Sequence, residues 1–301
     1  MNCRLPGKQS TFLFKHMYMD QQIINLYDEY THKPLHRNEF IRRLVLLTGS
    51  TAAAMAILPL LEVNQAKAAV TTADDLFTEY GTYEGVQGTM KAYVARPLAL
   101  KKYPVVIVIH ENRGLNAHIE DVARRVAKAG YLAIAPNALA PLGEMPPTED
   151  EARQKFQQLK AEDNLQNFIR VFDYIKTRKD AGNQIGCVGF CWGGAMANSL
   201  AVHIPQLKAA VAFYGRQADV KDVPKIKAAL QLHYAALDER INAGIPAFET
   251  ALKENGIRYE LYMYENVNHA FHNDTAPSRY NEAAAKLAWE RTLQFFQTHL
   301  K

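Results

Sequence analysis

Gly-Phe-Cys-Trp-Gly-Gly, at residues 189–194, is the stretch of this 301-residue chain that decides its predicted fold. Residues 184–188 before it are apolar like a short buried strand, and residues 195–202 after it can continue as a helix. A cysteine on a sharp strand-to-helix turn, flanked by glycines that allow close backbone approach, is typical of a nucleophile elbow with cysteine in place of serine. The stretch predicts a covalent hydrolase with Cys191 as nucleophile. A glycine-rich turn around a buried, inert cysteine is the alternative.

The acid partner is expected on a later loop, because in proteins with a nucleophile elbow of this kind the triad residues follow one another along the chain in the order nucleophile, acid, histidine. Residues 229–234 are strand-like, and Asp238 lies just past the end of that strand. Asp238 is therefore the candidate acid. A solvated loop carboxylate paired with Arg240 is the alternative for this residue.

The candidate base follows the next predicted strand, residues 258–264, whose side chains alternate in polarity. The loop after it contains two histidines, His269 and His272. His269 is preferred because it lies closer to the strand end. The ordered set of Cys191, Asp238 and His269 favours catalysis over coincidence.

The rest of the chain alternates strands and helices, which predicts an α/β fold with a mostly parallel central sheet and helices on both faces. Two early strands, at residues 78–83 and 90–96, are expected to form an antiparallel pair. Further strands are expected at residues 104–109, 131–135 and 209–214, and helices at residues 119–128, 149–178, 243–255 and 279–299. Residues 141–148 are either a lid or pocket rim, or an ordinary connection.

These residues give the chain a resemblance to the dienelactone hydrolase family, a branch of the α/β-hydrolase fold that uses a cysteine nucleophile. The resemblance runs from about Tyr80 to the C-terminus. Its motifs are His-Glu-Asn-Arg-Gly-Leu at 110–115, Asp-Val-Ala at 121–123, Gly-Tyr at 130–131, the elbow, Leu-Asp at 237–238 and Asn-His-Ala-Phe at 268–271. The resemblance implies that Cys191 is the nucleophile, His269 the base and Asp238 its orienting acid.

Glu111 is a fourth candidate, at the end of the apolar run 104–109, which is expected to be a central strand buried on both faces. A carboxylate in such a place is costly unless it has a partner. The resemblance implies that Glu111 contacts the resting cysteine and helps to generate the thiolate when substrate binds. The alternative is a structural ion pair of Glu111 with Arg113 or Arg124.

The resemblance also implies an oxyanion hole made by the backbone amides of Asn112 and Trp192. Each donor aimed at a developing oxyanion is typically worth about 3–4 kcal/mol in rate. In dienelactone hydrolases that take anionic lactones, arginines bind the substrate carboxylate, one of them a few residues after the catalytic histidine. Residues 269–274 contain no arginine, so the substrate stays open, and Arg113 and Arg216 are the candidate replacements.

Residues 1–68 are expected to be a leader. An arginine pair at 42–43 precedes an uncharged, mildly apolar run at 44–61, and small residues flank Lys67. Basic flank, apolar middle and small-residue site make up an export signal, and paired arginines favour the twin-arginine type. Small residues and Pro59 make the run a poor permanent membrane span.

The long region before the arginines is unusual for such a signal. If residues 1–36 form helices of their own, an N-terminal anchor or interaction helix is the alternative for the apolar run. Export to the periplasm is the preferred interpretation, with a membrane-anchored and a cytoplasmic protein as alternatives. Residues 69–301 are long enough for one α/β-hydrolase domain with a large core.

Charge and composition exclude several classes of function. Residues 1–68 carry eight Lys and Arg against five Asp and Glu, which leaves 27 and 26 for the remainder, a balance that does not attract nucleic acid. The sequence has no dinucleotide glycine fingerprint, no P-loop and no residues at zinc-ligand spacing, so neither a cofactor nor a metal is expected. The expected partner is a small-molecule ester or lactone, with no stable membrane span in the mature form. A monomer or small homo-oligomer is expected.

The cysteines also favour catalysis over crosslinking. Cys3 lies in the leader, and Cys187 and Cys191 are four residues apart on a predicted strand. That spacing separates them by about 13 Å, beyond the Cα limit of about 7 Å for a disulfide. Cys187 is expected to be a core residue.

Three functions remain after these exclusions. The preferred one is hydrolysis of lactones or small carboxylic esters through an acyl-enzyme on Cys191. A thioester or peptide hydrolase of the same fold is the second. A non-catalytic binding protein that retains the fold is the third.

Overall fold

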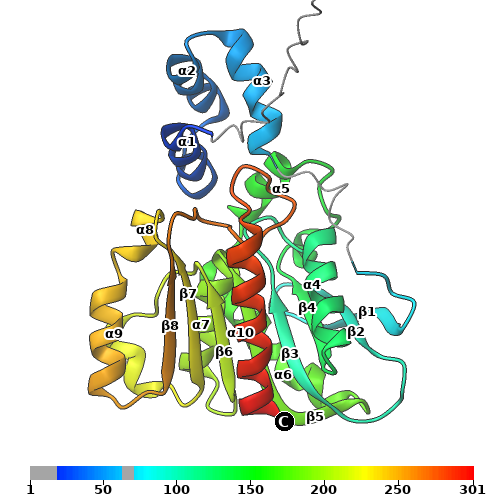
Figure 1. Cartoon of the computed structure of the whole chain (residues 1–301). Coiled ribbons are helices and arrows are strands. Elements are labelled where there is room, and N and C mark those ends of the chain that lie inside the picture. Colours follow the sequence, from blue (N-terminus) through cyan, green and yellow to red (C-terminus); the bar gives the residue numbers. More distant parts are fainter. Residues whose placement is uncertain (1–18, 63–70) are drawn as a thin grey trace, which may run out of the picture. The chain divides into compact units, whose positions relative to one another are not determined.

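The computed structural model of the chain describes residues 19–62 and 71–301 (Figure 1). The chain divides by its internal contacts into two units, Met1–Ala54 and Met55–Lys301, and each is described here by itself. The predicted leader boundary at residue 68 and Cys3 lie outside the described residues.

The larger unit is built on one eight-stranded sheet with the order β1-β2-β4-β3-β5-β6-β7-β8. β1 pairs with β2 and β2 with β4 in antiparallel fashion, and every other pairing is parallel. The strands are β1 (Leu76–Glu84), β2 (Thr89–Pro97), β3 (Tyr103–Ile109), β4 (Leu132–Asn137), β5 (Ala181–Phe190), β6 (Ala209–Phe213), β7 (Ala229–Ala235) and β8 (Tyr259–Tyr264). The predicted α/β class, mostly parallel sheet and early antiparallel pair are confirmed.

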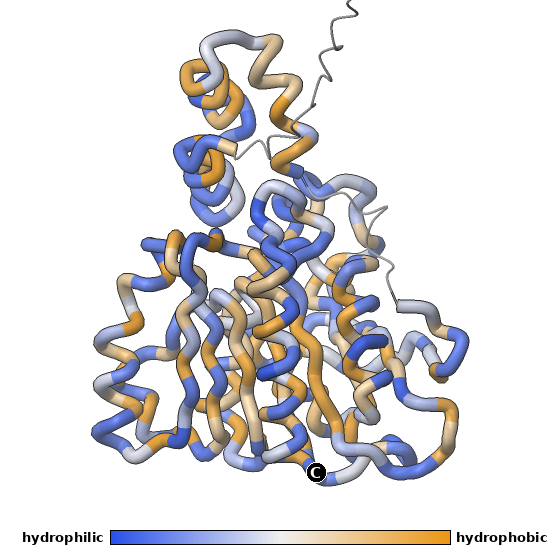
Figure 2. Tube along the Cα trace, viewed as in Figure 1, coloured by the Kyte–Doolittle hydropathy of each residue, from blue (hydrophilic) through white to orange (hydrophobic). Residues whose placement is uncertain are grey.

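Two layers of helices cover this sheet. The core on one face includes side chains of α6 (Ala161–Thr177), α7 (Trp192–His203) and α9 (Ile245–Glu254). The core on the other face includes side chains of α4 (Ala117–Lys128) and α10 (Glu282–Leu300). Strands β3 to β7 lie between these layers, and Figure 2 shows apolar residues running along the central strands. Parallel strands covered in this way meet at one edge with their carboxyl ends, where ligands bind in open α/β sheets.

The predicted helix at 149–178 is wrong in one respect, because the structure has two helices there. α5 (Glu149–Phe156) ends before α6 begins, and Gln157–Lys160 connect them. This connection contains no glycine or proline, so no local breaker marks it. The break between α5 and α6 is instead associated with packing. Phe156 and Leu159, on either side of it, both pack against the core on the α6 and α7 face of the sheet.

Other helix ends follow from caps. The last helix starts at Glu282 and not at 279, because the Asn281 side chain accepts a hydrogen bond from Ala284 N at 3.0 Å. Two short elements, α8 (Glu239–Asn242) and the 3-10 turn η3 (Val220–Lys225), follow β7 and β6. A further 3-10 turn, η2 (Ala140–Leu142), starts the segment that was predicted to be a lid or connection.

Residues 19–62 form the helices α1 (Gln21–His32), α2 (Arg37–Thr48) and α3 (Thr51–Leu61). Tyr30 stacks on Phe40 at 4.3 Å between ring centroids, which packs α1 against α2. Within the described residues no single helix is long and apolar enough to cross a membrane. α2 and α3 pass that test only as a pair, bent by 113° at the break between them.

Candidate active site

The predicted elbow lies between β5 and α7, and Cys191 is its central residue. Cys191 has φ 56° and ψ −113°, a backbone conformation that costs a non-glycine residue about 1–3 kcal/mol. A Cβ on Gly189 would lie 1.9 Å from the carbonyl oxygen of Gly193, and a Cβ on Gly193 would lie 2.3 Å from that of Ile109. Only glycine fits these two positions, so the physical reason predicted for both glycines is confirmed.

Cys191 stands at the first turn of α7 and is buried, with 7% of its surface exposed. Its amide donates to Phe213 O at 3.0 Å, which anchors the elbow on the end of β6. The unpaired amides at the start of α7 give this position a positive electrostatic environment. Cys187, four residues earlier, is fully buried, and burial raises the pKa of its thiol far above the usual range, so Cys187 is an inert core residue as predicted.

The structure brings the predicted acid and base together. His269 Nδ1 lies 2.5 Å from Asp238 Oδ2, and both side chains are buried. Asp238 Oδ1 also accepts from Ile241 N at 3.3 Å as the N-cap of α8, so both carboxylate oxygens are held. With Nδ1–H donating to Asp238, the neutral imidazole has its lone pair on Nε2. A ring nitrogen of His269 lies within 4.8 Å of Cys191 Sγ.

His272 is placed differently from His269. Its ring stacks on Phe190 at 5.0 Å and lies 5.6 Å from the Trp289 ring, between the sheet and α10. Burial holds the pKa of His272 well below its ordinary value. The ring is therefore a neutral part of the core.

Glu111 follows β3 and reaches two residues from other parts of the sheet. Asn273 Nδ2 donates to Glu111 Oε2 at 2.9 Å, and Tyr214 Oη donates to Oε1 at 3.5 Å. The Tyr214 ring also packs on His269, with 4.9 Å between ring centroids. Glu111 therefore belongs to the same polar cluster as the histidine.

Burial alone would raise the pKa of Glu111, yet its pKa lies below the ordinary value. Electrostatic interactions with nearby basic side chains outweigh burial, and these side chains are His118, Arg279, Arg113 and His269. The two arginines suggested as structural partners have ion pairs elsewhere, Arg113 with Glu149 at 3.3 Å and Arg124 with Asp121 at 3.3 Å.

The segments that carry the two predicted oxyanion donors lie against each other. The close approach of Gly193 to the carbonyls of Ile109 and His110 presses the start of α7 onto the end of β3. The Trp192 ring stacks on His110 at 5.5 Å, and His110 Nε2 accepts from Ala138 N at 3.0 Å. Burial lowers the pKa of His110 to about 4, so the ring on which Trp192 stacks is neutral. Asn112 follows directly on the same strand end.

The two arginines predicted as substrate contacts have different surroundings. Arg113 lines a cavity of about 150 Å³ together with residues of the 145–149 segment and α5. Residues 145–148 of the segment that starts at η2 therefore line this cavity beside Arg113. Arg216 is exposed, and its carbonyl oxygen accepts from Asn198 Nδ2 at 2.9 Å.

Comparison with known proteins agrees with this architecture. The model of the dienelactone hydrolase family matches residues 90–300. The chain belongs to the dienelactone hydrolase family. The family is hydrolytic, so the resemblance seen in the sequence and the prediction of a hydrolase are confirmed.

Individual relatives of this dienelactone hydrolase family member match over most of their length. A Synechocystis protein named "Putative carboxymethylenebutenolidase" is 32% identical, with 75% of this chain and 99% of that protein covered. A protein of the same name from Escherichia coli O157:H7 is 34% identical, with 76% and 90% covered. The crystal structure of a "Putative Dienelactone Hydrolase" from Klebsiella pneumoniae has a TM-score of 0.66 and 30% identity, with 74% and 99% covered.

Four residues of the polar cluster were not singled out from the sequence: Tyr214, Asn273, Arg279 and His118. Asn273 and Arg279 lie in the loop between His269 and α10. In the sequence, this loop stands out only because its first residues, 270–274, contain no arginine. Arg279 is 7% exposed and acts on Glu111 through its charge. A buried arginine ten positions after the histidine has no motif signal, since only the fold of the loop brings it there.

Proposed function

We propose that this chain hydrolyses lactones or small carboxylic esters through a Cys191–His269–Asp238 triad and an acyl-enzyme intermediate. One observation carries the proposal: His269 is bound at Nδ1 by a buried carboxylate, 2.5 Å away, and has a ring nitrogen within 4.8 Å of the elbow thiol. A nucleophile, a base beside it and a third group that orients the base are the parts of a triad.

The first half-reaction forms the acyl-enzyme. The Cys191 thiol gives its proton to Glu111, and the thiolate attacks the carbonyl carbon of the ester. The backbone amides of Trp192 and Asn112 bind the oxyanion of the tetrahedral intermediate. Collapse breaks the bond to the leaving oxygen, which takes the proton from Glu111 and leaves a thioester on Cys191.

The second half-reaction releases the acid. His269 takes a proton from a water molecule, and the hydroxide attacks the thioester carbon. Asp238 stabilises the imidazolium that forms. Collapse breaks the carbon–sulfur bond, and the sulfur takes the proton from His269, which restores the starting thiol and the neutral base.

Cys191→Ala tests this proposal. The variant is expected to keep its fold and lose hydrolysis of p-nitrophenyl acetate and of a small lactone, while wild type forms an acetyl adduct visible by intact mass. Cys191→Ser is expected to be severely impaired too, because a serine hydroxyl needs a fully formed base to lose its proton. Retention of more than about a tenth of turnover in Cys191→Ala would remove the covalent mechanism, since loss of a nucleophile costs orders of magnitude.

A substrate panel separates the remaining functions. Lactones and aryl esters are expected to turn over faster than thioesters or peptides. Preference for a thioester would make the chain an acyl hydrolase of another kind. Absence of turnover, together with no labelling of Cys191 by an iodoacetamide probe, would indicate a binding protein.

For the N-terminal region we propose export across the membrane, on the support of the basic pair Arg42 and Arg43 before the apolar helix α3. The test is the location of the full chain after cell fractionation. Replacement of both arginines by lysine is expected to retain the protein in the cytoplasm with its first residues intact. Equal distribution of the variant and the wild type would contradict a twin-arginine signal.

A further inference from the structure

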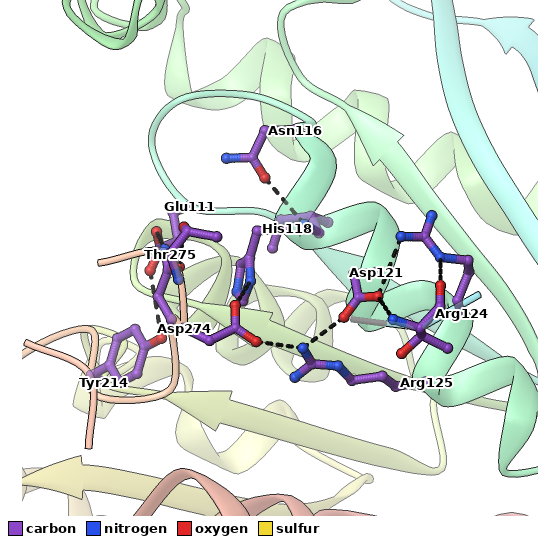
Figure 3. A network of polar contacts seen from close by, with 12 residues as sticks. Glu111, Asn116, His118, Asp121, Arg124, Arg125, Tyr214, Asp274 and Thr275 are labelled. Carbon is purple, nitrogen blue, oxygen red and sulfur yellow. Dashed lines mark hydrogen bonds and ion pairs between the residues drawn. The ribbon is translucent and has the colours of Figure 1, made fainter. Parts of the chain in front are cut away.

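A chain of charged side chains joins α4 to the loop that follows His269 (Figure 3). Asp274 Oδ1 lies 2.9 Å from His118 Nδ1, and Asp274 Oδ2 accepts from Arg125 at 2.5 Å. Arg125 also binds Asp121 at 2.6 Å, and Asp121 has no exposed surface. The triad uses none of these residues.

The residue before Asp274 holds Glu111. Asn273 Nδ2 donates to Glu111 Oε2 at 2.9 Å, while Asn273 Oδ1 accepts from the amide of Thr275 at 3.0 Å and from its hydroxyl at 2.6 Å. Consecutive residues of one loop therefore bind the candidate proton acceptor and the charged face of α4. Movement of Asp274 away from α4 would displace the amide that orients Glu111.

His118 connects the two by charge. Its ring is 2% exposed and lies in the first turn of α4. Among the basic side chains that lower the pKa of Glu111, His118 has the largest effect. Burial would raise the pKa of Asp274, but His118 and Arg125 hold it far below its ordinary range, so Asp274 stays ionised at any working pH. The ionised carboxylate of Asp274 holds the His118 ring at Nδ1, 2.9 Å away.

We propose that the His118–Asp274 ion pair is a positioning device that, through Asn273, holds Glu111 in the orientation needed to take the thiol proton of Cys191. The pair acts through Glu111 and Asn273 and does not touch substrate. The inference rests on the proposed function, because it assigns Glu111 the role of first proton acceptor.

Other groups that face Glu111 limit how far its titration shifts when the His118–Asp274 pair is broken. The remaining charged and titratable ones are Arg113 after β3, Tyr214 after β6, and His269 and Arg279 between β8 and α10. Around the pair itself lie Arg125, Asp121 and Arg124 of α4 and His272 of the loop. Since Arg113 and Arg279 stay beside Glu111, breaking the pair should shift the titration of Glu111 without reversing its charge at neutral pH.

The test is the acidic limb of the pH profile of kcat/KM for p-nitrophenyl acetate in His118→Gln and Asp274→Asn. His118→Gln removes the imidazole that lowers the pKa of Glu111, and Asp274→Asn removes the carboxylate that holds this imidazole, so the midpoint of the limb is expected to move up by about one pH unit, with about tenfold less activity at the acidic end. Activity at pH 8 should stay close to wild type. If the Asp274→Asn midpoint fell or stayed, the proposal would be overturned.

Two controls separate this effect from a loss of packing. Asp121→Asn removes another buried carboxylate from the same chain of charges, and is expected to lower the melting temperature and leave the midpoint unchanged. In a Glu111→Gln background, where turnover is expected to be lost, the pH profile of Cys191 alkylation by iodoacetamide should show no shift on adding His118→Gln. An equal loss of activity at every pH, or a shift that persists in that background, would reduce the pair to a structural role.

The result is distinguishable from a failure of the proposed function. An active Cys191→Ala protein would remove the covalent mechanism. An inactive Cys191→Ala protein together with unshifted His118→Gln and Asp274→Asn profiles would remove only the pair. If Asp274→Asn did not fold, His118→Gln alone would decide, since it leaves the Asp274–Arg125 ion pair in place.

Discussion

Asp238 and His269 are joined by a buried contact of 2.5 Å between Oδ2 and Nδ1, although they follow different strands. A backbone hydrogen bond from Leu237 N to Val267 O, 3.1 Å long, ties the two loops beside them. The loops after β7 and β8 are therefore linked by main chain as well as by the contact between the carboxylate and the imidazole.

Asp238→Asn should separate orientation from folding. Asparagine can still cap α8, so the fold is expected to survive. The tautomer and the imidazolium of His269 lose their support, so kcat is expected to fall by up to about 10⁴ with a small change in KM. Steady-state kinetics and a melting curve measure both. A rise in KM at constant kcat would place Asp238 in substrate binding instead.

His269→Ala and His272→Ala are expected to fail in different ways. Loss of a general base typically costs about 10²–10⁴ in rate, so His269→Ala should abolish turnover at nearly unchanged stability. His272 packs between Phe190 and Trp289, so its loss should lower the melting temperature more than kcat/KM. Similar kinetic losses in both variants would contradict the choice of His269.

Asn273→Asp changes one hydrogen-bonding group and keeps the shape. The oxygen that accepts from Thr275 is retained, while the donor to Glu111 becomes a second carboxylate oxygen 2.9 Å away. Two carboxylates so close cannot both ionise easily, so one pKa is expected to rise strongly and activity to move to higher pH. Asn198→Asp is the control, because it buries a new charge against Arg216 O, on a different partner. It should lower stability and leave the pH profile unchanged.

Gly193→Ala tests the elbow. The new Cβ would lie 2.3 Å from Ile109 O and 2.5 Å from His110 O, both backbone atoms that cannot turn away. We expect a loss of more than about 3 kcal/mol or no folding, beyond ordinary overpacking. Gly256→Ala is the control: it has φ +62° and open space, so only left-handed strain of about 1–2 kcal/mol applies. Urea unfolding of both proteins makes the comparison, and equal losses would contradict the packing argument.

Buried His233 should make stability fall in acid. Its Nε2–H donates to Gln231 Oε1 at 3.0 Å and its Nδ1 accepts from Tyr264 Oη at 2.9 Å, and burial lowers its pKa to about 3. The unfolded chain therefore binds a proton that the folded chain does not, from the unfolded pKa of about 6.5 downward. Stability is present above pH 6.5 and is lost toward pH 3, by about 2 kcal/mol at pH 5. His233→Gln should flatten this part of the urea-unfolding profile; an unchanged slope would exclude His233 as its source.

Sequence patterns predicted the features that depend on the order of residues along the chain. They did not predict the features that depend on tertiary packing. The elbow, the strands and the succession of Asp238 and His269 follow from periodicity, glycines and strand ends. The orientation of Arg216 and the burial of Arg279 depend on how loops fold over the sheet, which no local pattern encodes. The break after Phe156 has the same cause, because it lacks a residue that disfavours helix.

The distribution of the candidate residues over the sheet has a consequence for synthesis of the chain. Glu111 and Cys191 leave the ribosome before β8, the edge strand that precedes the His269 loop, has been made. A nascent chain that stops short of this strand contains both partners of the proposed acylation step but not the base of the proposed deacylation step. The ability to release the acyl group therefore arises with the last strand to be added.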